Sequence, residues 1–153
     1  MDIAADRRPL TAEQINWLRV NAYLPPLVLL GTLFVCVASS TCLLVTFPET
    51  PFLIGFVAAA GILALAAAAL TLLYAYRNYM DLRDGVAQVR TARLIGKRRR
   101  KSARNMPRYY LRFEGLDELE TLPETFDRLS EGSAYTVIYS PRVRRCWDAE
   151  AQQ

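Results

Sequence analysis

The chain has no histidine among its 153 residues. Histidine is the commonest general base near neutral pH and the commonest metal ligand, so neither role has its usual side chain. The seven glycines are scattered, none lies in a G-x-x-x-x-G-K phosphate loop, and no serine sits in a G-x-S-x-G nucleophile elbow. We therefore expect a protein that is not an enzyme and that uses no cofactor or metal.

Carboxylates remain as a source of acid–base chemistry, because seven of them follow one another in a short stretch. They could supply a catalytic pair, but they also suit a solvated face that keeps the domain soluble and offsets nearby basic charge. We favour the solvated face. The seven are Glu114, Asp117, Glu118, Glu120, Glu124, Asp127 and Glu131.

Cysteine is also scarce. Cys36 and Cys42 lie in the first apolar run and Cys146 lies near the end of the chain, so no pair has metal-ligand spacing. A reducing cytoplasm would also argue against a disulfide at Cys146. We interpret all three as small hydrophobic side chains.

Charge is missing from two long runs, Val20 to Pro48 and Thr50 to Tyr76, which only Glu49 separates. Each exceeds the roughly 20 residues that a helix needs to cross a bilayer. The first run is longer than the apolar part of a signal peptide and has no clear cleavage site after it. We predict an integral membrane protein with a two-helix transmembrane hairpin over residues 20–79, with spans at about 22–47 and 52–76.

Arginine placement gives the orientation of this hairpin. Arginines precede the first span and follow the second, whereas the connection "FPETP" has none. The positive-inside rule then places both termini in the cytoplasm of what we expect to be a prokaryotic inner or plasma membrane, with residues 1–19 as a cytoplasmic segment. Interfacial aromatic residues agree with the inner boundary. They are Trp17, Tyr23, Tyr74, Tyr76 and Tyr79.

Small residues recur four apart in the second run and predict a face for close helix packing. This stripe could pack the two spans against each other, which we favour, or it could serve a homo-oligomer or a larger complex. Neither span has an ionisable side chain, which argues against a transport component. The stripe consists of Gly55, Ala59, Ala60, Ala64 and Ala68.

Residues 81–148 change to a composition typical of strands, with residues 149–153 as a tail. "RYYLRFEG" alternates, which puts Tyr109, Leu111 and Phe113 on one face. "AYTVIYS" is the clearest strand, with Tyr135, Val137 and Tyr139 on one face. "PETFDRLSEG" suggests one or two helical turns, and "RVRRCW" a short last strand. Four or five strands with little helix predict a small, mostly β, antiparallel barrel-like cytoplasmic domain.

Several segments in this order carry a resemblance to known proteins. "DGV", a basic hairpin, "YYLRF", "LSEGSAYTVIYSPR" and "WDAE" follow one another. The chain resembles an uncharacterised group of prokaryotic two-span membrane proteins with a small cytoplasmic β-barrel, in which a Gly-x-x-Tyr-x-Val-x-Tyr-x-Pro pattern recurs. The matching residues here are Gly132, Tyr135, Val137, Tyr139 and Pro141. The resemblance implies the fold and no activity.

A dense basic run lies between the first two predicted strands of this domain. We favour a solvated loop, ahead of contact with anionic lipid, because a straight strand would carry the run about 30–35 Å from the strand's start. No aromatic residue lies within the run for a base to stack on, so nucleic acid is not favoured. The seven basic residues are Lys97, Arg98, Arg99, Arg100, Lys101, Arg104 and Arg108.

Three function classes are compatible with this sequence. We favour a membrane-anchored, non-enzymatic scaffold or accessory subunit, with a protein partner or a second copy of the chain. The first alternative is a membrane-surface or nucleic-acid binding module that uses the basic hairpin. The second alternative is a transport component.

Overall fold

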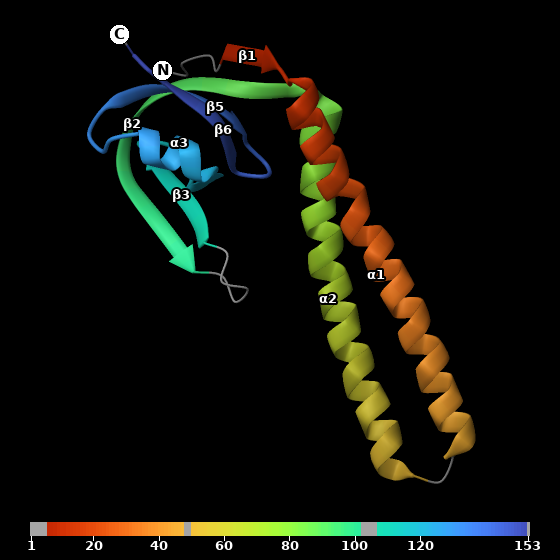
Figure 1. Cartoon of the computed structure of the whole chain (residues 1–153). Coiled ribbons are helices and arrows are strands. Elements are labelled where there is room, and N and C mark those ends of the chain that lie inside the picture. The colour runs from red at the N-terminus through yellow and green to blue at the C-terminus, as the bar shows by residue number, and fades with distance from the viewer. Residues whose placement is uncertain (1–5, 48–49, 102–106, 153) are drawn as a thin grey trace. The chain divides into compact units, whose positions relative to one another are not determined.

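The computed structural model describes residues 6–47, 50–101 and 107–152. They form two compact units: Trp17–Tyr79, and a second unit made of the chain up to Asn16 together with the chain from Met80 onward. The first unit contains most of two long helices, and the second contains a six-stranded sheet and a short helix (Figure 1).

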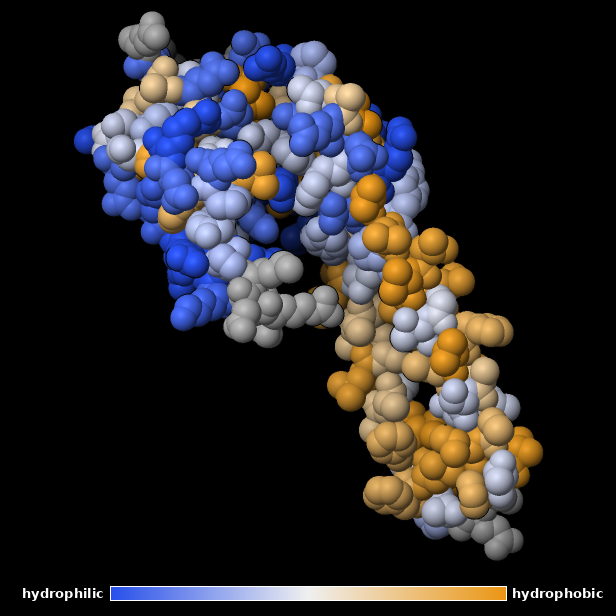
Figure 2. Space-filling view, in the orientation of Figure 1, coloured by the Kyte–Doolittle hydropathy of each residue, from blue (hydrophilic) through white to orange (hydrophobic). Residues whose placement is uncertain are grey.

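The predicted spans coincide with helices, except that the first span ends one residue beyond its helix. Helix α1 (Ala12–Thr46) and helix α2 (Pro51–Asp84) are long and apolar enough to cross a membrane. Most of their large apolar side chains are exposed, and the helical part is mostly hydrophobic in Figure 2. Each helix also extends into polar sequence beyond its predicted span, because backbone hydrogen bonding does not depend on the hydropathy that defines a span.

A capping box starts α1 well before its apolar run. The Thr11 backbone N–H donates to Gln14 Oε1 at 3.0 Å, and the Gln14 N–H donates to Thr11 Oγ1 at 3.4 Å. These two bonds satisfy N–H groups that have no partner within the helix. Farther along, Asn21 and Tyr74 join α1 to α2, since Tyr74 Oη donates to Asn21 Oδ1 at 3.0 Å.

The sheet is mixed, whereas the sequence predicted an antiparallel one. Its strand order is β1-β2-β3-β4-β6-β5, and β2 also pairs with β5. Every pair is antiparallel except β4–β6, which is parallel because the segment between these strands crosses over through α3 and β5. The strands are β1 (Asp6–Pro9), β2 (Val86–Lys101), β3 (Pro107–Phe113), β4 (Leu119–Thr121), β5 (Ala134–Ser140) and β6 (Arg145–Ala151), and the short helix α3 is Pro123–Arg128.

Strand β1 was not predicted, because "DRRP" has no apolar alternation. It pairs antiparallel with the start of β2, from Asp6 opposite Val89 to Pro9 opposite Val86. The Leu10 N–H extends this ladder by donating to the Gly85 carbonyl at 3.1 Å. Part of the predicted N-terminal segment, residues 1–19, therefore belongs to the sheet.

Strand β2 contains five of the seven basic residues that the sequence placed in a loop. It continues through Lys101 because β3 folds back on it and pairs from Leu94 opposite Phe113 to Lys101 opposite Pro107. A register shift between Leu94 and Gly96 marks a bulge. The sixth, Arg108, lies in β3, and Arg104 lies outside the described residues.

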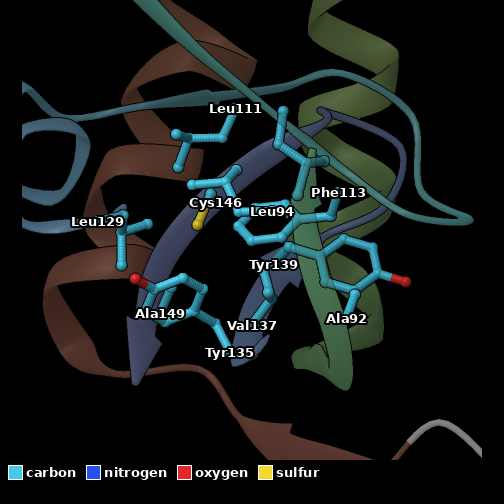
Figure 3. Close-up of a cluster of buried hydrophobic side chains, with 11 residues drawn as sticks. Ala92, Leu94, Leu111, Phe113, Leu129, Tyr135, Val137, Tyr139, Cys146 and Ala149 are labelled. Carbon is cyan, nitrogen blue, oxygen red and sulfur yellow. The ribbon is translucent and has the colours of Figure 1, made fainter. Parts of the chain in front are cut away.

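The inward faces of the strands form one apolar core (Figure 3). Leu94, Leu111, Phe113, Leu119 and Val137 are each at most 1% exposed. Burying each such side chain contributes about 1.5–3 kcal/mol. The predicted inner faces of "RYYLRF" and "AYTVIYS" are confirmed at these positions.

Strand β6 runs through Ala151, so it includes residues that the sequence assigned to a tail. Tyr135 lies opposite Ala151, and Val137 lies opposite the buried Ala149. The added pairing lengthens the ladder and buries one more small side chain.

The turn between β5 and β6 is tied to the end of α2. Asp81 is 2% exposed and accepts the Val143 backbone N–H at 2.9 Å. Arg142 lies 3.6 Å from Asp81 and forms a second ion pair with Asp84. These contacts position the last turn of α2 against the sheet domain to which it belongs.

Candidate functional site

The basic run is one half of a two-stranded ribbon formed by the end of β2 and the start of β3. The register places Arg98 opposite Tyr110 and Arg99 opposite Tyr109. Successive side chains of a strand point to opposite faces, so neighbouring arginines lie on different sides of the ribbon. The sequence keeps these aromatic and basic residues far apart, and the antiparallel pairing brings them together.

On the inner face, Lys97 has a structural role. Its Nζ lies 4.4 Å from the centroid of the Phe126 ring in α3 and donates to the Leu129 carbonyl at 2.8 Å. Its backbone N–H donates to Glu131 Oε1 at 2.7 Å. The ammonium group is thus held by the segment that covers the core and is a poor candidate for ligand contact.

Arg99 also lies on the inner face, where its guanidinium group lies over an aromatic ring. Its guanidinium carbon is 5.6 Å from the Tyr109 centroid, and the Tyr109 and Phe126 centroids are 5.0 Å apart. Such cation–π contacts contribute about 0.5–1 kcal/mol at exposed sites. This side of the ribbon therefore stabilises the packing of α3.

The outer face carries a row of residues across four strands. Arg98, Tyr110, Glu120 and Arg145 are consecutive Cα partners in β2, β3, β4 and β6. Neighbouring strands lie about 4.8 Å apart, so the row is about 14 Å long. Further arginines flank it on the same face. We call this surface the arginine face, made of Arg98, Arg100, Arg108, Tyr110, Arg112 and Arg145.

Two arginines of this face are ion-paired. Arg100 lies 3.9 Å from Glu118, and Arg108 lies 3.8 Å from Glu120. All four side chains are more than a third exposed, so each pair contributes at most about 1 kcal/mol and is weakened by salt. These pairs leave the arginines accessible to a ligand anion.

Arg98 and Arg112 form no ion pair within the described residues. Both side chains are exposed. Arg112 lies opposite Gly96, whose lack of a side chain leaves the surface beside it open. The arginine face therefore has cations with no carboxylate to neutralise them.

Aromatic surface adjoins these cations. The Arg100 guanidinium carbon lies 5.5 Å from the Tyr110 centroid, and that of Arg145 lies 5.2 Å from the Trp147 ring. Trp147 occupies a register shift in β6 and donates from Nε1 to Ser140 Oγ at 2.8 Å. Both rings are half-buried, so each is held in place and keeps part of its surface in solvent.

Cys146 is inert. Its side chain is 1% exposed, and burial raises the pKa of the thiol to about 12. A thiol needs a lowered pKa and access to solvent to act as a nucleophile. The expectation that Cys146 behaves as a small hydrophobic residue agrees with its place in the core cluster.

The acidic stretch does not converge on one point. Asp117 pairs with Arg144 at 3.1 Å, while Glu118 and Glu120 pair with separate arginines of β2 and β3. Among the described residues, no group of three or more carboxylates, cysteines or histidines could hold a metal ion. Three of the seven carboxylates therefore serve as counter-charges to arginines of β2, of β3 and of the turn before β6.

The small-residue stripe of α2 is divided between two environments. Ala64 and Ala68 are half-buried, whereas Gly55, Ala59 and Ala60 are exposed. A Cβ placed on Gly55 would meet nothing within 4 Å, so no other segment approaches it closely in the described structure. The partial burial of Ala64 and Ala68 agrees with a packing role for that part of the stripe, while packing of the two spans through the stripe and an oligomer contact at its exposed part both stay predictions.

No protein-family model, curated protein or solved structure matches this chain. The resemblance to two-span membrane proteins with a small β domain therefore stays a prediction, and the site rests on its own geometry.

Sequence reasoning found the basic half of the arginine face and missed the rest. Tyr110, Arg112 and Arg145 come from other strands, and only strand pairing shows that they share a face with Arg98. Trp147 adjoins this face through its contact with Arg145. Alternation in "RYYLRF" already separated Tyr110 and Arg112 from the core residues. That alternation was the available signal.

Proposed function

We propose that this chain is a membrane-anchored, non-enzymatic scaffold or accessory subunit that presents its small β domain in the cytoplasm. The observation that carries the proposal is the pairing of β1 with β2. Strand β1 precedes the first apolar helix and β2 follows the second. Two segments that pair in one sheet must lie on the same side of a membrane, which fits two spans with both termini together.

Arginine content supports the cytoplasmic side. Arg7 and Arg8 lie in β1, and Arg77 and Arg83 lie in the last turns of α2. Lys and Arg close to span ends are retained on the cytoplasmic side. We propose the inner or plasma membrane of a prokaryote as the location.

We also propose that the sheet closes into a five-stranded barrel. The pairings β2–β3, β3–β4, β4–β6, β6–β5 and β5–β2 form a ring, and β2 has the length to take part at both ends. Closure removes most exposed strand edges, which otherwise invite aggregation. A closed, rigid domain suits the presentation of a binding surface.

Topology reporters test the anchor. After Gln153, a reporter enzyme that works only in the cytoplasm is expected to be active, and one that works only outside is expected to be inactive. At Glu49 the opposite result is expected. A chain cut off after Thr46, with the reporter fused there, serves as the control for export of the first span. An external C-terminal reporter would overturn the proposed orientation.

Crosslinking in intact cells tests the scaffold role. The full chain, purified afterwards in mild detergent, should yield one discrete heavier species with a second protein in fixed ratio. If the chain is recovered only by itself, the scaffold proposal is wrong.

A further inference from the structure

We propose that the arginine face binds single-stranded nucleic acid. This inference adds a ligand to the proposed scaffold, and it rests on the proposed cytoplasmic placement of the β domain, where nucleic acid is encountered. It is argued from three features of the face: the type of its cations, the rings beside them, and the length of the row.

The cations of the face are all arginines. Alternation from Leu111, which lies opposite Lys97, puts Lys97 and Lys101 on the other side of the ribbon. Arginine presents a planar fork of donors that binds phosphate oxygens in pairs, whereas lysine acts as a point charge. Arg98 and Arg112 are exposed and form no ion pair within the described residues, so they can take phosphate without first losing a carboxylate.

The rings of the face are placed between arginines. Tyr110 lies in the row next to Arg98 and beneath Arg100, and Trp147 lies beside Arg145. Bases stack on aromatic rings and on guanidinium planes, while arginines track the backbone phosphates. Three of the four positions of the row, Arg98, Tyr110 and Arg145, offer these surfaces, and the fourth, Glu120, is ion-paired with Arg108. The row's length of about 14 Å corresponds to about four stacked nucleotides at about 3.4 Å each.

Single-stranded nucleic acid uses more of this face than other anions do. An anionic lipid surface would be attracted equally by lysine and has no ring to stack on Tyr110. An acidic peptide has carboxylates for the arginines, yet it does not present a planar group at every residue. A ligand that alternates phosphates with planar bases engages both the arginines and the rings.

Fluorescence anisotropy with the full chain in a neutral detergent tests the inference. The probes are labelled oligouridine and oligothymidine several times longer than the row. Arg98→Ser with Arg112→Ser should lower the slope of log affinity against log salt by about 1.4, since each phosphate contact contributes about 0.7 for single strands. Arg7→Ser with Arg8→Ser removes the same charge from β1 and should leave the slope unchanged.

Substitutions at Tyr110 separate stacking from charge attraction. Tyr110→Leu should weaken oligonucleotide binding at least about fivefold, while Tyr110→Phe keeps the ring and should bind nearly as well as the parent chain. The parent melting temperature, retained in all variants, checks that the sheet is intact. A competing duplex of the same length should displace the probe poorly.

Several results would overturn the inference. One is the absence of oligonucleotide binding at low salt, and another is equal binding by Tyr110→Leu and Tyr110→Phe. A third is a salt-dependence slope that falls equally in the Arg98 and Arg112 double variant and in the Arg7 and Arg8 double variant. The face would be assigned to lipid instead if the chain did not bind oligonucleotides but bound vesicles that contain anionic lipid, and if the Arg98 and Arg112 changes abolished that vesicle binding. An external C-terminal reporter together with intact oligonucleotide binding would contradict the orientation alone.

Discussion

Replacing Val137 by aspartate should unfold the sheet domain, and the loss should depend on pH. Val137 is 0% exposed and lies in the core with Leu94, Leu111 and Phe113. Arg90 of β2 lies opposite Val137, but its guanidinium is already engaged, because Nη1 donates to the Gly115 carbonyl at 3.0 Å. The new carboxyl group would therefore remain neutral in the folded chain, with its pKa raised by burial.

The loss of unfolding free energy in Val137→Asp follows from the cost of protonating the new carboxylate when the domain folds. Near pH 7, keeping an aspartate neutral takes about 3 pKa units, or about 4 kcal/mol, and the lost valine burial adds about 1.5–3 kcal/mol. A domain of this size has a free energy of unfolding of about 4–11 kcal/mol. Since the folded pKa is raised, the stability is present below the unfolded pKa near 4 and is lost as the pH rises. Lowering the pH from about 7 to about 5 should restore about 3 kcal/mol.

Cys146 provides the assay, because it is buried in the same core. In the full chain with Cys36→Ala and Cys42→Ala, a maleimide pulse at increasing urea reports the fraction of molecules with an open sheet domain. The labelling rate is normalised at each pH to that of the fully denatured chain. The parent should stay protected to higher urea than Val137→Asp, and the gap should narrow at the lower pH.

Thr91→Asp is the matched control, since Thr91 is exposed on β2 and lies opposite Thr136 of β5. It adds the same charge to the same sheet without burying it, and its urea midpoint should stay close to that of the parent. Equal protection of Cys146 in Val137→Asp and Thr91→Asp would refute the assignment of Val137 to the core. A destabilisation that is independent of pH would refute the buried-carboxylate reasoning.

Three further changes test separate parts of the structure. Gly132→Ala should reduce the free energy of unfolding by about 1–2 kcal/mol, because φ is +88° there, whereas Gly96→Ala should be nearly neutral, as measured by urea unfolding. Ala64→Leu on the half-buried side of α2 should reduce crosslinking between single cysteines in the two helices more than Ala66→Leu on its exposed side, and equal effects would contradict the packing assignment. Arg8→Pro should lower the free energy of unfolding of the sheet domain by about 1 kcal/mol relative to Arg8→Ser, because it removes a β1 donor, and identical urea midpoints for the two variants would show that this donor adds no stability.

Much of the local structure could be predicted from residue patterns. Absence of charge from Val20 to Pro48 and from Thr50 to Tyr76 predicted two long apolar helices, and α1 and α2 contain these runs apart from the residues of the connection between the helices. Alternation predicted that Leu111 and Phe113 share the inner face of β3. These features depend on neighbours within a few residues, so the sequence carries them directly.

The candidate site was predictable only in its basic half. Arg98 and Arg100 belonged to a visible charge run, but the run was assigned to a loop between two predicted strands, whereas both residues lie in β2. Pairing with β3 puts Tyr110 opposite Arg98. The sequence separation between the two residues hides this contact.

What the sequence by itself determined is therefore the periodic part of the protein: the two apolar helices, the inner faces of β3 and β5, and the lack of histidine chemistry. Only the tertiary structure decided that β1 joins the sheet, that β4 and β6 run parallel, and that one face gathers arginines from β2, β3 and β6. The physical reason is that hydrophobic periodicity records which side of an element is buried. Strand partners and register arise from hydrogen bonds between segments distant in the chain, and these have no periodic signal within either segment.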